Sequence, residues 1–169
     1  MRTTTLLIVL ALLLAPALAE EEEKITITDE DGRNVAVPLD PNSIICLSPG
    51  ASEVIYALGE SDRIIAVTED CDMPPTLLEK EHIGKSGGDA DIEKIIELNS
   101  DLVIGKTGAL FPEDMEQKLT DYRIPVLWYR LLHIDALIPM IRDLGRVLEK
   151  KDEALEMADR ISGYYDTVF

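Results

Sequence analysis

The chain has 169 residues, with 16 Lys and Arg against 33 Asp and Glu, and a formal net charge of −17 at pH 7. Such an acidic chain is poorly suited to nucleic acid, because binding phosphates requires clustered Lys and Arg. Its length and its 46% hydrophobic residues are sufficient for one domain with a core.

The first 19 residues are predicted to be a secretory signal peptide. Arg2 gives a positive start, Leu6–Leu14 is an apolar run, and Ala17-Leu18-Ala19 is a cleavage signal. The run is too short for a membrane span, and Pro16 interrupts its end. No cysteine follows the cleavage site, so we do not expect a lipid anchor there. We therefore expect export to the periplasm or the outer face of the cytoplasmic membrane.

A β-hairpin is predicted at Lys24–Val37, because apolar residues alternate with polar ones on both sides of an Asp31-Gly32 turn. The next stretch, Ser43–Gly59, reads as a buried strand, a sharp turn and a helix. Ser48 is suited to cap that helix and Pro49 to be its first residue.

Short apolar strands and amphipathic helices then alternate. This pattern predicts an α/β fold: a Rossmann-like lobe with a mainly parallel sheet of about four strands and helices on both faces. The further strands are expected at Arg63–Thr68, Asp101–Ile104 and Ile124–Tyr129, and the further helices at Asp91–Asn99 and Pro112–Tyr122.

The last segment keeps apolar residues at helical spacing from Asp135 onward. It predicts one helix of about 30 residues, roughly 45 Å long at 1.5 Å per residue. Pro139 falls near its first turn, where a missing N–H costs little. We accordingly divide the chain into a signal peptide at 1–19, an α/β ligand-binding lobe at 20–132 and a long helix at 133–169.

The loops that follow the predicted strands are the expected ligand surface, because the carboxyl ends of parallel strands meet at one edge of a sheet. Lys85, Lys106 and Arg130 could give that edge a local positive patch suited to an anionic ligand; scattered surface cations are the alternative reading. The expected ligand-binding residues are Ser48, Pro49, Asp70, Met73, Lys85, Ser86, Lys106, Thr107, Tyr129 and Arg130.

A directly bound metal ion is a rival interpretation of the same edge. Asp70, Cys71, Asp72 and His82 are suitable ligand types, but no H-x-H or C-x-x-C spacing occurs. We therefore predict neither a metal site nor a cofactor.

Catalysis finds little support in the sequence. Ser48 lacks a G-x-S-x-G elbow, and the chain contains no dinucleotide or P-loop glycine motif. We expect a protein that is not an enzyme.

The two cysteines could be joined by a disulfide or remain free thiols. Cys46 lies inside a predicted core strand and Cys71 in a predicted loop. Export would allow a disulfide, whereas a buried Cys46 also behaves as a small hydrophobic side chain.

Several motifs together resemble the N-terminal half of the substrate-binding proteins of ABC importers for iron-siderophores, haem and cobalamin. Their order and spacing carry the resemblance. They are Ile27-Thr28-Asp29-Glu30-Asp31-Gly32-Arg33, Leu47-Ser48-Pro49, Ser52-Glu53, Asp72-Met73-Pro74-Pro75, Ile83-Gly84, Ile92-Glu93-Lys94-Ile95 and Leu98-Asn99-Ser100-Asp101-Leu102-Val103-Ile104.

The resemblance implies a function and partners. Two α/β lobes in that family are joined by a long helix and hold the ligand between them, and this chain looks like one lobe plus that helix. It implies capture of an iron chelate or a cobalamin-type ligand outside the membrane and delivery to an ABC permease with its ATPase. Glu93 matches the glutamate that docks onto the permease. The family's cobalamin binders carry aromatic rings at loops matching Asp70, Ser86 and Lys106, and none of these three residues is aromatic.

An isolated lobe of this kind suggests an alternative. Its long helix would expose an apolar face, and large exposed apolar patches rarely stay free. We therefore also expect a homo-oligomer, in which the chain acts as an interaction module without binding a small ligand.

Overall fold

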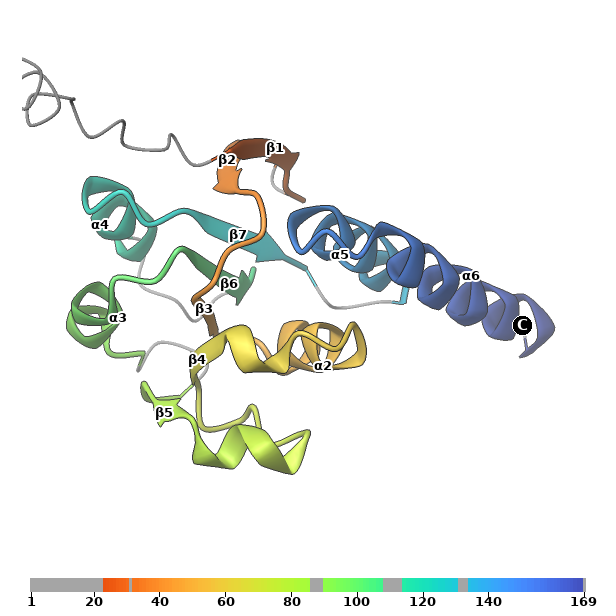
Figure 1. Ribbon diagram of the computed structural model, residues 1–169, viewed down its shortest axis with the longest axis horizontal. Helices are drawn as coiled ribbons and strands as arrows, with labels where there is room; N and C mark the ends of the chain where they lie inside the picture. Colours follow the sequence, from red (N-terminus) through yellow and green to blue (C-terminus); the bar gives the residue numbers. More distant parts are fainter. Residues whose placement is uncertain (1–22, 31, 86–89, 108–113, 131–133, 169) are drawn as a thin grey trace, which may run out of the picture.

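The computed structural model describes residues 23–30, 32–85, 90–107, 114–130 and 134–168. Its centre is a sheet of five strands in the order β5-β4-β3-β6-β7, and all neighbouring strands are parallel (Figure 1). The predicted α/β class with a parallel sheet is confirmed. The strands are β3 (Ile44–Cys46), β4 (Ile64–Val67), β5 (Glu81–His82), β6 (Leu102–Lys106) and β7 (Val126–Tyr129).

The sheet has one strand more than the sequence predicted. The additional strand, β5, is only two residues long and pairs Glu81 with Ala66 and His82 with Val67. Both of its residues are exposed at the edge of the sheet. An edge strand this short needs no apolar run, so periodicity gave no signal for it.

Alternate side chains of β3, β6 and β7 enter opposite layers of the core. In β3, Ile44 and Cys46 pack with α2 (Pro49–Ala57) and the C-terminal helices, whereas Ile45 packs with two further helices on the other face. This alternation follows from the two-residue period of a strand. The prediction of helices on both faces is therefore confirmed.

The two helices on the second face are α3 (Ile92–Leu98) and α4 (Met115–Asp121). Asp91 caps α3 by accepting a hydrogen bond from the Lys94 N–H at 2.9 Å, as a short polar side chain at this position commonly does. The expected start of α4 at Pro112 lies outside the described residues. None of the described helices is both long and apolar enough to cross a membrane.

The predicted hairpin is present as β1 (Lys24–Thr28) and β2 (Asn34–Pro38), which pair in antiparallel register. It packs on the first face of the sheet beside the C-terminal helices (Figure 1). The Asp40 N–H just beyond it donates to the Val147 carbonyl at 2.8 Å. The hairpin thus ties the start of the described chain to its last third.

The prediction of one continuous C-terminal helix of about 30 residues is wrong. The segment forms α5 (Ile134–Val147) and the longer C-terminal helix α6 (Lys151–Val168), which runs back along α5 (Figure 1). Glu149 between them adopts a left-handed conformation with φ of 56°, and the Lys150 N–H donates to the Gly145 carbonyl at 2.8 Å. These two features define a Schellman motif, which ends a helix.

The close packing of α5 against α6 explains why the chain turns back. A Cβ added to Gly145 would lie 2.2 Å from the Cβ of Ala154, so the two helices approach where both side chains are small. Leu144 on α5 and Ala158 on α6 are buried in the same cluster. The apolar residues at helical spacing therefore belong to two helices, α5 and α6, which pack against each other.

A cluster of charges fixes the turn between α5 and α6 to the end of α2. Glu60 binds Arg63 at 2.5 Å and Lys150 at 3.0 Å, and its side chain is only 15% exposed. Burial alone would raise the pKa of Glu60, but the hydrogen bonds from Arg63 and Lys150 outweigh it and lower the pKa. Arg63 also donates to the Pro41 carbonyl at 2.8 Å.

Replacing Gly145 with alanine tests the helical hairpin. The added methyl group would meet Ala154, so we expect Gly145→Ala to lower the free energy of unfolding by about 1–3 kcal/mol. The matched control is Gly163→Ala on α6, where nothing lies within 4 Å of the new methyl group. It should stabilise by up to about 1 kcal/mol. Urea unfolding measures both, and stabilisation by both changes would instead favour one continuous helix.

The charge cluster predicts a pH dependence of stability. Because the pKa of Glu60 is lowered on folding, its contribution is present above its ordinary value of 4.5 and is lost as the pH falls through the folded value. Glu60→Gln should cost about 1 kcal/mol at pH 7, and this difference should shrink in acid. Urea unfolding at several pH values measures it, with the exposed Glu79→Gln as control. A difference that is constant with pH would contradict the assignment.

Candidate functional site

The order of the strands creates a switch point beside β3. The chain leaves β3, crosses over to β4 on one side, and later enters β6 on the other side. Ligands of open α/β sheets bind at the carboxyl ends of the strands where the direction of crossing reverses. We call the loops at these ends, residues 47–49, 68–74, 83–85, 106–107 and 129–130, the carboxyl edge.

Ser48 lies at this switch point, directly after β3, and is the N-cap residue of α2. Its side chain is buried, makes no capping hydrogen bond, and its Oγ has no hydrogen-bond partner among the described residues. Pro49 is the first residue of α2, as predicted, and the first turn carries no acidic side chain. The amino end of α2 is therefore a partial positive charge with no carboxylate from its own turn.

Thr107 lies across the switch point, directly after β6. Its N–H donates to the Tyr129 carbonyl at 2.9 Å, which holds the start of this loop against β7. Its Oγ1 is a second buried hydroxyl without a partner in the described part of the chain. Lys106, the last residue of β6, is exposed.

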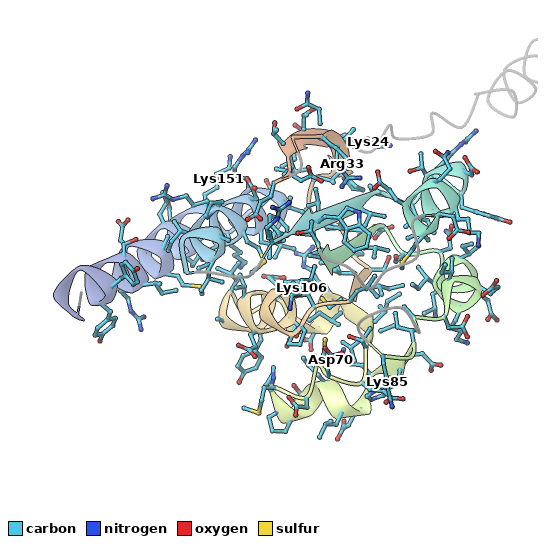
Figure 2. The ribbon with its side chains drawn as sticks, turned by 180° about the vertical axis from the view of Figure 1, so that it is seen from behind. Lys24, Arg33, Asp70, Lys85, Lys106 and Lys151 are labelled. Carbon is cyan, nitrogen blue, oxygen red and sulfur yellow. The ribbon has the colours of Figure 1, made fainter. Side chains whose placement is uncertain are left out.

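The loops after β4 and β5 bring both signs of charge to the edge. Figure 2 shows Asp70, Lys85 and Lys106 on the same side of the molecule. The ammonium of Lys85 lies 3.9 Å from a carboxylate oxygen of Glu69, and Asp70 is also exposed. The predicted positive patch is thus interleaved with carboxylates. Met73, in the loop after β4, is 56% exposed and is the most accessible apolar side chain of the carboxyl edge.

Tyr129 and Arg130, also expected at the edge, both make contacts within the protein. The Tyr129 side chain is 1% exposed and lies in the core layer under α5. Burial raises the pKa of Tyr129, and the nearby Asp143 carboxylate raises this pKa further. Its placement gives no support to ligand contact through its ring. The Arg130 backbone N–H donates to the Glu30 carboxylate, so the tip of the hairpin reaches this edge.

The approach of the hairpin tip was not foreseen from the sequence. Asp29 accepts hydrogen bonds from the N–H and the guanidinium of Arg33, and Arg33 also pairs with Glu116 on α4. These contacts place Glu30 next to Arg130. No local pattern could reveal this, because residues 30 and 130 meet only through the packing of the hairpin on the sheet. Ser86, also predicted at the edge, lies outside the described residues.

Glu93 is the second residue of α3 and is exposed, as a docking residue must be. Asp114 raises the pKa of Lys118 on α4, and the Glu93 carboxylate adds a smaller effect in the same direction. Glu53 on α2 is also exposed, on the opposite face of the sheet. Glu93 lies in the first turn of α3 and Glu53 at the middle of α2.

The residues proposed for a directly bound metal do not form a site. Cys71 is fully buried, whereas Asp70, Asp72 and His82 are exposed. No group of three or more His, Cys, Asp or Glu side chains that could hold a metal ion occurs in the described part of the chain. The rival interpretation of a bare metal site is not supported.

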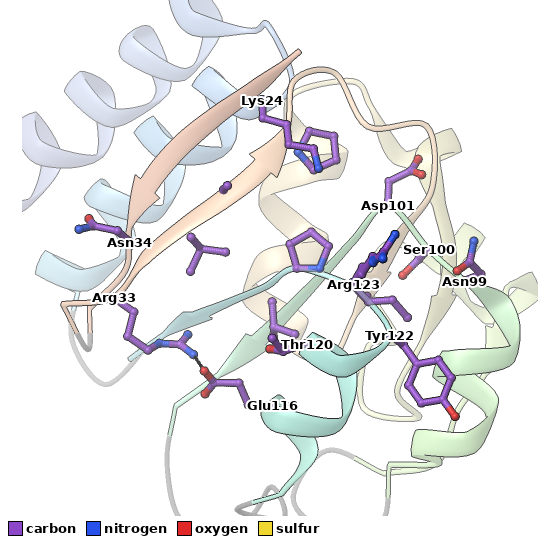
Figure 3. A pocket seen from close by; sticks show the side chains of 16 residues that line it. Lys24, Arg33, Asn34, Asn99, Ser100, Asp101, Glu116, Thr120, Tyr122 and Arg123 are labelled. Atoms are coloured by element: carbon purple, nitrogen blue, oxygen red, sulfur yellow. Dashed lines mark ion pairs between the residues drawn. The ribbon is translucent and has the colours of Figure 1, made fainter. Parts of the chain in front are cut away.

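A groove of about 610 Å³ lies elsewhere, between β2 and the open edge of β7 (Figure 3). Lys24, Arg123 and Asp101 line it, and Arg33 and Glu116 form an ion pair at one end. It extends toward the amino ends of β6 and β7, away from the switch point. Asp101 is used structurally there, since its carboxylate accepts hydrogen bonds from the N–H groups of residues 42 and 43.

Comparison with known proteins places this geometry in context. A family model described as periplasmic binding protein matches residues 44–168. The ABC transporter substrate-binding lipoprotein YvrC of Bacillus subtilis, described as uncharacterized, is 28% identical over 137 residues, which cover 78% of this chain and 43% of that protein.

Two solved structures are similar to this chain. The periplasmic vitamin B12 binding protein BtuF of Vibrio cholerae has a TM-score of 0.69 at 28% identity, over 77% of this chain and 50% of its own. The molybdate-bound MolA of Haemophilus influenzae has a TM-score of 0.70 at 21% identity, over 79% of this chain and 49% of its own. The second likeness concerns the fold alone. The chain spans about half the length of the relatives it matches.

Two buried serines in one helical turn provide a matched test of the unpaired hydroxyl. Ser52 Oγ donates to the Pro49 carbonyl at 2.8 Å, whereas Ser48 Oγ has no partner among the described residues. We expect Ser52→Ala to lower the free energy of unfolding by about 1 kcal/mol, and Ser48→Ala to raise it by about 1 kcal/mol, because the second change removes a buried hydroxyl that has no partner. Urea unfolding measures both. An equal cost would show that Ser48 caps α2 in solution.

Proposed function

Because this chain belongs to the periplasmic binding protein family, we propose that it forms one ligand-binding lobe of the solute-binding component of an ABC importer. It captures its ligand outside the cytoplasmic membrane and delivers it to a permease that is driven by an ATPase. No bond is made or broken in this function. The similarity to an ABC transporter substrate-binding lipoprotein and to a periplasmic vitamin B12 binding protein supports the proposal.

The observation that carries the proposal is the pair of buried, unpaired hydroxyls at the switch point. Ser48 follows β3 and Thr107 follows the neighbouring strand β6, and neither Ser48 Oγ nor Thr107 Oγ1 has a partner among the described residues. An unsatisfied buried polar group costs about 1–3 kcal/mol, so such groups need an explanation. A small shift of the adjoining loops would let a polar group of the ligand form hydrogen bonds with both hydroxyls.

The ligand is a metal chelate of the siderophore or cobalamin type. The exposed groups of the carboxyl edge carry both charges: Lys85 lies beside Glu69, and Lys106 and Asp70 are also exposed. Met73 adds apolar surface. This combination suits a large polar ligand with charged substituents better than a small ion. Neither Asp70 nor Lys106 offers an aromatic face, which favours a siderophore-like chelate over cobalamin.

Glu93 serves as the docking residue for the permease. Its carboxylate is exposed at the start of α3, where the helix dipole favours negative charge. An exposed carboxylate beside the ligand edge can pair with an arginine of a membrane partner without a large desolvation cost.

A fluorescence titration tests ligand binding. Trp128 is the single tryptophan, and its ring packs directly over Gly105 at the carboxyl end of β6. A ferric catecholate siderophore, haem and cyanocobalamin are each titrated into the protein. We expect saturable quenching by one of them. Lack of quenching by all three would contradict the proposed ligand class.

Two exposed lysines provide the matched variants for this titration. Lys106 lies at the carboxyl edge and Lys151 at the start of α6, well separated from it (Figure 2). Lys106→Ala should weaken the binding of an anionic chelate about tenfold, because one charge-assisted hydrogen bond is lost. Lys151→Ala should leave binding unchanged. Equal effects of both changes would indicate nonspecific attraction.

A further inference from the structure

The two cysteines are brought together by the fold although they lie 25 positions apart in the chain. Cys46 is the last residue of β3, and Cys71 lies in the loop after β4. Both are fully buried thiols in this structure, and both side chains belong to the core layer beneath α2. They therefore occupy the same side of the sheet.

The backbone holds the loop of Cys71 against the end of β3. Thr68 N–H donates to the Cys46 carbonyl at 3.1 Å, and Cys71 N–H donates to the Thr68 carbonyl at 3.0 Å. The second bond folds the chain back after β4, so that the Cys71 Sγ lies 3.7 Å from the Cys46 carbonyl oxygen. The Cys71 thiol is also 3.4 Å from Thr68 Oγ1.

We propose that Cys46 and Cys71 form an intramolecular disulfide when the chain folds in an oxidising compartment. Cys46 pairs with Val67 across the β3–β4 ladder, and the turn at Thr68 returns the Cys71 Sγ to 3.7 Å from the Cys46 carbonyl oxygen. A disulfide requires the two cysteine backbones to lie close together, and the contact of the Cys71 Sγ with the Cys46 carbonyl oxygen shows that the Cys71 side chain reaches the Cys46 backbone. This inference rests on the proposed export, because the cytoplasm is reducing and keeps cysteine thiols from forming disulfides.

The chemistry is thiol–disulfide exchange with a disulfide oxidant. One cysteine thiolate attacks a sulfur of the oxidant, forms a mixed disulfide and releases one thiol. The second cysteine then attacks the cysteine sulfur of that mixed disulfide and releases the second thiol. The two cysteines are oxidised, the oxidant is reduced to two thiols, and these carry the two protons that the cysteines lose.

Burial determines when the bond forms. Burial raises the pKa of the Cys46 thiol, and the neighbouring Cys71 adds to this effect; burial also raises the pKa of Cys71. Thiols with raised pKa values in an apolar core react slowly. The bond therefore forms during folding, before β3 and the loop after β4 are covered by α2.

The disulfide would stabilise the carboxyl edge. It closes a loop that starts at the last residue of β3 and contains α2 and β4, and it fixes the segment that presents Asp70 and Met73 to a ligand. Closing a loop of this length lowers the entropy of the unfolded chain. We expect the oxidised protein to melt about 10 °C above the reduced protein.

The experiment is refolding of the full chain in defined redox buffers. Protein unfolded and reduced in denaturant is refolded with a mixture of reduced and oxidised glutathione, and its remaining thiols are then alkylated in denaturant and counted by mass spectrometry. We expect a monomer with no alkylated thiol and a peptide that joins Cys46 to Cys71. Two alkylated thiols, glutathione adducts or a disulfide-linked dimer would overturn the proposal.

A double variant provides the control for the melting temperature. In Cys46→Ala/Cys71→Ala, a reductant should not change the melting temperature, whereas it should lower that of the wild type. An equal response of both proteins would also overturn the proposal. If the double variant fails to fold, the thiol count of the wild type still decides. If the disulfide forms but no ligand binds, only the proposed function is contradicted. If the ligand binds while both cysteines remain thiols, only the proposed disulfide is contradicted.

Discussion

The burial of β3 on both faces is the constraint on which the rest of the structure depends. Ile44, Ile45 and Cys46 are all fully buried, because α2 and α5 cover one face and α3 and α4 the other. A parallel strand with two parallel neighbours requires crossovers on both sides. The loops after β3 and β6 therefore diverge at one point, and this divergence sets the position of the candidate site.

The carboxyl edge gathers groups whose properties depend on burial more than on residue type. The same serine side chain is satisfied at position 52 and unpaired at position 48, within one turn of α2. Tyr129 is the last residue of β7 and therefore lies at the carboxyl edge, but its side chain is buried in the core near Asp143. The packing of the fold decides which polar atoms of the carboxyl edge have no partner. The order of residues in the chain does not reveal this.

The C-terminal segment shows how a correct local pattern can lead to an incorrect shape. Residues 148–150, Leu-Glu-Lys, are good helix formers, and no glycine or proline marks the turn. The chain turns there because Gly145 and Ala154 allow close helix packing and because Glu60 binds Lys150. Tertiary contacts outweigh the cost of the left-handed conformation at Glu149, which local propensity alone would not favour.

The sequence by itself determined the α/β class, the hairpin, the parallel strands and the helix starting at Pro49, because each depends on apolar periodicity and turn residues within a few positions. It also placed the loops of the carboxyl edge together, since loops that follow parallel strands must share an edge. Only the tertiary structure decided the strand β5, the helical hairpin, the contact of Glu30 with Arg130 and the meeting of Cys46 with Cys71. These features join residues distant in the chain or override local preference, and only the packing of the whole lobe fixes them.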